Sequence, residues 1–236
     1  MFKLTLVALM LWSSVVPQQD ASRTFRKVER LEDVKVGELQ VNDVLLSEFL
    51  LKLSDNTKIA FCVENRKDET VDSLGGLRLN LEIRSADDVQ TVLQRIHAKY
   101  PIVRWRIEEG IVVISAADIQ SDPLNGMLGP FSISATVGEL VRYLNFHVTG
   151  LLADTLEVAG MYPTKTAYSL MFDSDAKASQ VLSRLTRDSG IRWYASIRDH
   201  GMSLEIPDGP NGQPVKTTTG RVSLMFGRGP IPLLVR

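Results

Sequence analysis

Two stretches of the chain share one order of features: QTVLQRIHAKYPIVRWRIEEGIVVIS, Gln90–Ser115, and SQVLSRLTRDSGIRWYASIRDHGMSLEI, Ser179–Ile206. Each contains Val-Leu-x-Arg, a polar helix end, Arg-Trp, a charged turn with Gly and a strand. A helix that leads into a β-hairpin produces this order. The duplication therefore predicts two copies of one structural unit in a small protein.

Each unit is expected to contain two helices, because apolar residues recur at i, i+3, i+4 and i+7. In the first unit these stripes are Leu46, Phe49, Leu50, Leu53 and Val89, Val92, Leu93, Ile96. In the second they are Val137, Leu140, Val141, Leu144 and Ala178, Val181, Leu182, Leu185. Thr136 with Glu139 has the spacing of a capping box, as does Ser85 with Asp88, and Ser174 is expected to cap the last helix.

Strand candidates separate these helices. In 77–83, leucine and isoleucine alternate with Arg78, Asn80 and Glu82, as in a strand with one buried face. The segments 58–64, 152–158 and 167–172 are further candidates, and 102–107 with 111–115 predicts a hairpin. In the second unit the hairpin is expected to pair 191–197 with 202–206. Each unit then has the order β-α-β-β-α-β-β.

These elements predict an α+β fold of two tandem modules, each a small sheet packed by two helices. The expected boundaries are a signal peptide at 1–20, an N-terminal linker at 21–33 and a first module at 34–119. A linker at 120–130, which contains Pro and Gly, leads to a second module at 131–208. A Pro/Gly-rich linker and C-terminal tail occupy 209–236.

The N-terminus predicts export. Lys3 precedes a mostly apolar run from Leu4 to Val16. Such a run is too short for a hydrocarbon core of about 30 Å, but it fits the apolar region of a signal peptide. We therefore expect a periplasmic or secreted protein without a membrane span after removal of the signal peptide.

Composition argues against a nucleic-acid partner. The 236 residues include 27 Lys and Arg and 28 Asp and Glu, a formal net charge of -1 with both signs mixed along the chain. A nucleic-acid-binding domain usually has a basic face instead. The single cysteine, Cys62, lies in a strand-like apolar run and is expected to be a small buried hydrophobe.

The pattern of LRLNLEIRSADDVQTVLQRI followed by RWRIEEGIVVIS resembles the secretin and TonB short N-terminal domain, called STN. The resemblance covers about 34–117 and, more weakly, 131–207. It implies an envelope module that binds another protein, and it provides no catalytic residues. The expected function is therefore a non-catalytic, exported protein-binding module of the bacterial cell envelope, for example an accessory to a secretin or TonB-dependent system. The partner is an envelope protein of unknown identity.

No motif in the sequence predicts catalysis. His97, His147 and His200 lack metal-ligand spacing, and no nucleophile or phosphate-loop motif is present. We identify no catalytic, cofactor-binding or metal-ligating residue, and we expect no cofactor. Trp105 and Trp193 are expected to pack in the core. The alternative is an enzyme or a ligand-carrying protein with a site in the cleft between modules, where His147 or Asp154 would lie.

The C-terminal tail gives the only candidate binding residues. Val222, Leu224 and Phe226 alternate with Ser223 and Met225, as in a strand with one buried face. The tail is expected to dock partly on the second module, while the stretch after Gly227 stays available for a partner. The candidate partner-binding residues are Val222, Leu224, Phe226, Arg228, Leu233 and Leu234.

Overall fold

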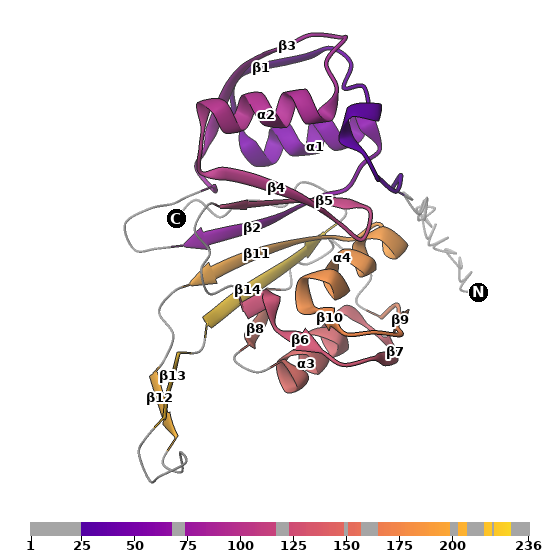
Figure 1. Ribbon diagram of the computed structural model, residues 1–236, viewed down its shortest axis with the longest axis vertical. Helices are drawn as coiled ribbons and strands as arrows, with labels where there is room; N and C mark the ends of the chain where they lie inside the picture. Colours follow the sequence, from indigo (N-terminus) through magenta and orange to yellow (C-terminus); the bar gives the residue numbers. More distant parts are fainter. Residues whose placement is uncertain are drawn as a thin grey trace, which may run out of the picture.

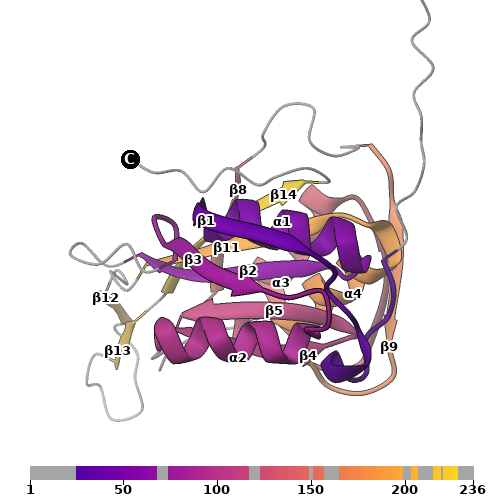
Figure 2. The ribbon, with the colours of Figure 1, turned by 90° about the horizontal axis from the view of Figure 1, so that it is seen from above.

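The computed structural model describes residues 25–67, 74–116, 123–148, 151–156, 165–198, 203–206, 215–218 and 220–227. It has an α+β fold, as expected, with five layers that are stacked from top to bottom in Figure 1 and lie over one another in Figure 2, which is seen from above. A six-stranded sheet forms the middle layer. A pair of helices covers each of its faces, and a two-stranded ribbon covers each helix pair.

The middle sheet has the strand order β4-β5-β2-β11-β14-β8. Its strands are β4 (Val103–Glu108), β5 (Ile111–Ala116), β2 (Phe61–Lys67), β11 (Arg192–Arg198), β14 (Gly220–Gly227) and β8 (Leu151–Leu156). The β4–β5 and β11–β14 pairs are antiparallel, and the other three pairs are parallel. Strands β4 and β8 are therefore the two edges of the sheet.

The outer layers come from one unit each. In the first unit, α1 (Leu46–Thr57) and α2 (Val89–Lys99) lie under the ribbon of β1 (Leu39–Leu45) and β3 (Arg78–Ile83). In the second unit, α3 (Val137–His147) and α4 (Ala178–Ser189) lie beside the ribbon of β7 (Phe131–Ala135) and β9 (Tyr168–Phe172). All four expected apolar stripes are buried, with no side chain in them more than 4% exposed.

The two units have the same topology, which agrees with a duplicated chain. In each, the first and third of the five main strands form the ribbon (β1 with β3, β7 with β9), and the other three form half of the middle sheet. Strands β11, β14 and β8 run opposite to their counterparts β4, β5 and β2, and their helices lie on the opposite face of the sheet. The units are therefore related by a half-turn about an axis that lies in the sheet and runs perpendicular to the strands, combined with a translation of three strands along that axis.

The structure corrects the expectation of two separately packed modules. Parallel pairing of Val63–Lys67 in β2 with Tyr194–Arg198 in β11 joins the two half-sheets into one. Each half also contributes to the other unit's core. Cys62 and Val113 belong to the core of the second unit, and Tyr194 and Met225 belong to that of the first.

The structure also corrects the second hairpin. The antiparallel partner of β11 is β14, not the segment 202–206. Instead, β12 (Ser203–Ile206) pairs with β13 (Val215–Thr218) in a separate two-stranded ribbon that projects from the body of the protein (Figure 1). The second unit therefore extends to Gly227 rather than ending at residue 208.

Two expected linkers belong to the folded body. Within 120–130, the short helix η2 (Pro123–Asn125) and strand β6 (Met127–Leu128) place Leu124 and Leu128 in the second core. Strand β6 pairs with β10 (Ala176–Lys177). In the N-terminal segment, which includes η1 (Leu31–Asp33), Val28 and Leu31 are buried in the first core. The expected signal peptide at 1–20 lies outside the described residues.

Helix caps follow the sequence in part. The Thr136–Glu139 capping box of α3 is confirmed. Asp88 is the N-cap of α2, and its carboxylate accepts a hydrogen bond from the Thr91 N–H, so Ser85 is not the cap. This bond lowers the pKa of Asp88. Helix α4 has Lys177 at its N-cap position instead of Ser174.

Candidate functional site

Strand β4 forms one edge of the middle sheet, and among the described residues it pairs only with β5. A two-residue turn connects β4 to β5. Its residues Glu109 and Gly110 both have positive φ, 52° and 81°, as a tight hairpin turn requires. This turn fixes which backbone groups of β4 face outward.

Residues that flank a two-residue turn form a hydrogen-bonded pair, and non-hydrogen-bonded pairs alternate with such pairs along the hairpin. Glu108 and Ile111 are the flanking pair. Ile107 and Trp105 therefore direct their N–H and C=O groups away from β5, toward the outer edge. Two contacts support this alternation: the Val112 N–H, opposite Ile107, bonds to Ala60 O at 3.0 Å, and the Val103 N–H bonds to Tyr100 O at 3.0 Å.

Apolar and aromatic side chains lie on one face of this edge. Trp105 is half-buried and Ile107 is 39% exposed, and both face the first unit's side of the sheet. The Trp105 ring packs edge-on against the His97 ring from α2, with centroids 6.0 Å apart. Trp105 is therefore a surface residue of the edge, and the expectation that it packs in the core is only half correct; Trp193 is fully buried.

His97 occupies the beginning of the same edge. One Arg104 nitrogen lies 2.9 Å from His97 Nε2, and His97 Nδ1 lies 2.9 Å from Val103 O. Because arginine can only donate, Nε2 accepts and Nδ1 donates to the carbonyl. The outward C=O of Val103 is thus occupied, and the open part of β4 begins at Trp105.

The other face of β4 carries a buried charge cluster. Arg106 donates to both oxygens of Glu64, at 2.7 and 2.5 Å, and its Nε donates to Glu108 at 2.8 Å. The Glu108 carboxylate also accepts a hydrogen bond from Ser179 Oγ at 2.6 Å. Burial opposes the charge of Arg106, but the hydrogen bond and charge of Glu64, then those of Glu108, outweigh it and raise the Arg106 pKa.

Helix α4 of the second unit rests on this hairpin of the first. Beside the Ser179 contact, Arg184 Nε donates to Glu109 Oε2 at 2.6 Å, and an Arg187 nitrogen lies 3.4 Å from the same oxygen. Glu108 and Glu109, at the charged turn of the first hairpin, therefore bind the second unit. These contacts hold in place the face of β4 that is turned toward the second unit. They leave the outer edge of β4 without a partner strand in the described part of the chain.

The residues expected to bind a partner through the tail have a different role. Val222, Leu224 and Phe226 are 0% exposed and lie in β14, between β11 and β8. Their apolar character fits the core, so they are not available to a partner in this fold. Arg228, Leu233 and Leu234 lie outside the described residues.

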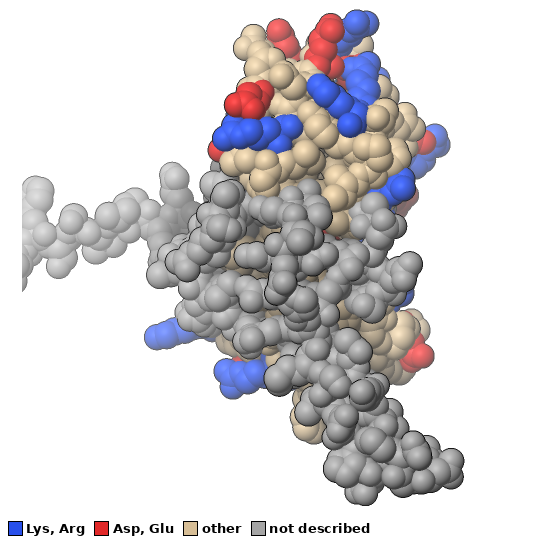
Figure 3. Space-filling model, turned by 90° about the vertical axis from the view of Figure 1, so that its left-hand side faces the viewer, with Lys and Arg blue, Asp and Glu red and all other residues tan. Residues whose placement is uncertain are grey.

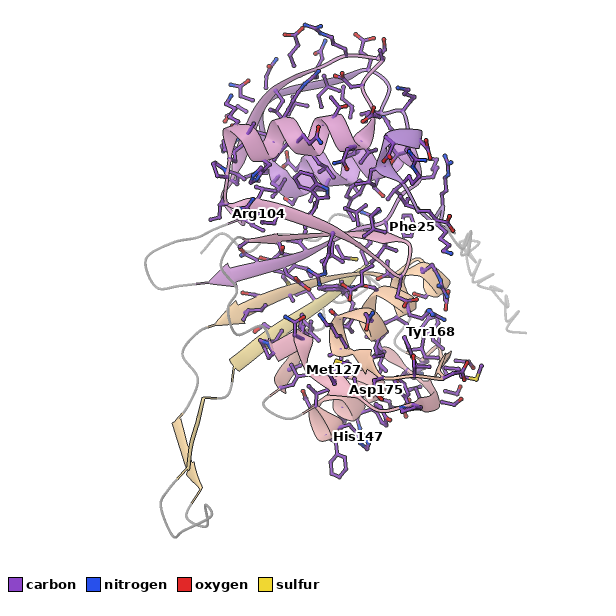
Figure 4. All side chains as sticks on the ribbon, in the orientation of Figure 1. Phe25, Arg104, Met127, His147, Tyr168 and Asp175 are labelled. Atoms are coloured by element: carbon purple, nitrogen blue, oxygen red, sulfur yellow. The ribbon has the colours of Figure 1, made fainter. Side chains whose placement is uncertain are left out.

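Of the residues named for the alternative functions, the structure describes the side chain of His147 alone. His147 is exposed at the end of α3 and packs against Tyr143 with ring centroids 4.2 Å apart, well below Arg104 in Figure 4. His200 and the side chain of Asp154 lie outside the described part. Within that part, no cluster of three metal-ligating side chains occurs, and no helix is long and apolar enough to span a membrane.

The surface of the first unit carries both signs of charge. Figure 3 shows basic and acidic side chains next to each other over its upper part. Many are paired, for example Arg95 with Asp87 and Arg78 with Asp43. Large exposed apolar residues of the described chain are few: Ile107, Met127, Phe146 and Met171. Of these, Ile107 is the one on an open edge of the middle sheet.

Comparison with protein-family models, curated proteins and solved structures finds no match for this chain. The candidate site therefore depends on its own geometry. The sequence predicts 102–107 as a hairpin strand but does not identify it as a sheet edge. The alternation of Arg and Glu with Trp and Ile in RWRIE was visible, but alternation does not show whether a second neighbouring strand exists.

Cys62 is expected to be inert in the folded protein. Its thiol is 0% exposed, and burial raises its pKa to about 12. Since the thiolate is the reactive form, a disulfide reagent at pH 8 should leave Cys62 unmodified in native protein and modify it fully in denaturant. Rapid labelling of native protein, followed by absorbance, would contradict this burial.

Proposed function

We propose that this protein is a non-catalytic, exported module of the bacterial cell envelope, periplasmic or secreted, that binds a protein partner through the outer edge of β4. The observation that carries the proposal is the outward direction of the N–H and C=O groups of Trp105 and Ile107 at a sheet edge. A partner strand adds to such an edge through main-chain hydrogen bonds, and neighbouring side chains provide specificity.

The side chains along the edge suit such a partner. Trp105 offers a large, partly rigid apolar surface, because His97 already supports its ring. Aromatic residues and arginine are enriched among the residues that dominate binding energy at interfaces. Trp105 and Ile107 thus form a short recognition strip beside the open backbone groups, and Arg104, bonded to His97, lies at its beginning.

The cellular setting of the proposal comes from the sequence. The apolar run from Leu4 to Val16 supports export, and the resemblance to STN supports an envelope partner. An accessory role to a secretin or a TonB-dependent system is the specific form of this proposal. In that role, the protein would bind its partner without catalysing a reaction and without a cofactor.

The test uses three baits in an envelope extract: wild type, Ile107→Lys and Met171→Lys. The lysine at position 107 puts a charge in the recognition strip, whereas Met171, 61% exposed on β9, gives a matched control on another strand. We expect the wild type and the Met171→Lys control to capture the same protein and Ile107→Lys to lose it.

Hydrogen exchange then locates the contact on the purified complex. The Trp105 and Ile107 amides should exchange fast in the free protein and slowly in the complex, because they become hydrogen-bonded. If Ile107→Lys retains the partner with unchanged affinity, or these amides are not protected, β4 is not the binding edge.

A further inference from the structure

We propose that β4 of a second copy of this chain occupies the β4 edge, in antiparallel pairing about a two-fold axis at Arg106. The inference rests on the proposed function, since it names the partner of the same edge. Two middle sheets would then form one continuous sheet, with β8 at both ends. Such an interface uses the same surface on both copies, so the assembly closes at two chains.

The direction of the backbone groups selects the register. In antiparallel pairing, a hydrogen-bonded pair needs outward N–H and C=O groups on both residues. With the axis at Arg106, Trp105 of each copy lies opposite Ile107 of the other, so all the outward groups of these residues find partners. An axis at Trp105 would instead place Ile107 opposite Val103, whose N–H and C=O are already occupied by Tyr100 and His97.

Charge selects the same register. With the axis at Arg106, the exposed Arg104 of each copy lies opposite Glu108 of the other, whose carboxylate also binds Arg106 and Ser179 of its own chain. The two Arg106 side chains face one another, but each is already neutralised by Glu64 and Glu108 of its own chain. An axis at Trp105 would instead place Arg104 opposite Arg106, so that Arg104 would face no carboxylate across the axis.

The apolar face adds to this complementarity. Trp105 and Ile107 form two equivalent cross-strand pairs in this register, and an aromatic residue opposite a β-branched one is a favourable pair. Ile107 is 39% exposed in the single chain. Pairing would cover it and extend the strip of Trp105 and His97 across the axis.

The dimer should be weak and reversible. A specific, stable interface buries about 1,200–2,000 Å² in total, and one short strand from each side buries less. We therefore expect a dissociation constant on the order of micromolar. Such an affinity lets a different strand compete for the same edge.

Sedimentation velocity on the full chain, over about 1–100 µM to bracket this constant, tests the inference. Wild type and Met171→Lys should shift from monomer to dimer with concentration, and Ile107→Lys should stay monomeric with an unchanged melting temperature. Arg104→Glu, which changes an exposed side chain and places a carboxylate opposite Glu108, should raise the dissociation constant about tenfold at low salt.

Different outcomes separate the two proposals. A wild type that stays monomeric throughout, or an Ile107→Lys variant that dimerises like wild type, overturns self-pairing. If the monomer still captures an envelope protein in a way that Ile107→Lys abolishes, the proposed function survives without self-pairing. If the dimer forms and Ile107→Lys leaves envelope capture unchanged, the edge serves self-pairing, and the proposed envelope partner binds elsewhere.

Discussion

Replacing Phe226 by alanine is expected to lower the free energy of unfolding by about 3–5 kcal/mol, the usual range for a buried phenylalanine. Phe226 is 0% exposed, lies opposite Trp193 in the β11–β14 pair and packs in the second core. The cavity left by its ring would lie in the second core, between the middle sheet and the helices of the second unit. Urea denaturation followed by circular dichroism measures the change.

Phe146 supplies the matched control. It is 85% exposed on α3, so Phe146→Ala should change the free energy of unfolding by no more than about 0.5 kcal/mol. Comparing the two substitutions shows whether the C-terminal segment that contains Phe226 is part of the folded core or docks only loosely on it. Equal, small effects of the two substitutions would contradict the position of β14 between β11 and β8.

Replacing Arg106 by methionine should be nearly as damaging. The change would leave Glu64, 1% exposed, and Glu108, 8% exposed, without their shared cation. Removal of one partner of a buried pair costs about 3–5 kcal/mol, and we expect the lower end because 37% of the Arg106 side chain is exposed. Arg104→Met, two residues away on the same face, should have a much smaller effect.

The pH dependence of this variant provides a second test. Without Arg106, the two carboxylates would be buried with no shared cation, and burial disfavours a charged group. Low pH favours neutral carboxyl groups and would relieve this penalty. Arg106→Met should therefore recover stability relative to wild type as pH falls toward about 4, near the carboxyl reference values. An unchanged deficit at low pH would show that lost packing, not charge, causes the damage.

Periodicity predicted the parts of the fold that local sequence determines. The four helices and their buried stripes follow from apolar spacing, and the shared topology of the two units follows from the repeated order of helix, Arg-Trp strand and turn. The partner of β11 did not follow from these rules. Residues 202–206 read as a strand and come directly after a turn, as the first unit's hairpin does after Glu109 and Gly110. Local residue spacing does not indicate that the chain forms the β12–β13 ribbon before β14 pairs with β11.

The candidate site could not be predicted because it is a property of the assembled sheet. A strand such as RWRIE has the same alternation at an edge or in the middle. Its outer side is open because the second unit joined the other end of the half-sheet, through β2. Likewise, Val222, Leu224 and Phe226 were correctly read as one face of a strand, but apolar character alone did not distinguish a core strand from a binding segment.

The parallel junction of β2 with β11 has a kinetic consequence. Its two strands are separated by most of the chain, since β2 begins at Phe61 and β11 at Arg192. Contacts between such distant segments form slowly, because a long loop must close first. Until β11 pairs with it, β2 is an unpaired edge strand in a nascent or refolding chain. The side chains of Cys62 in β2 and Val113 in β5 are also exposed at that stage, because the helices of the second unit do not yet cover them. Early intermediates should therefore be prone to aggregation at β2, and a fragment that ends after β5 would keep that vulnerability permanently.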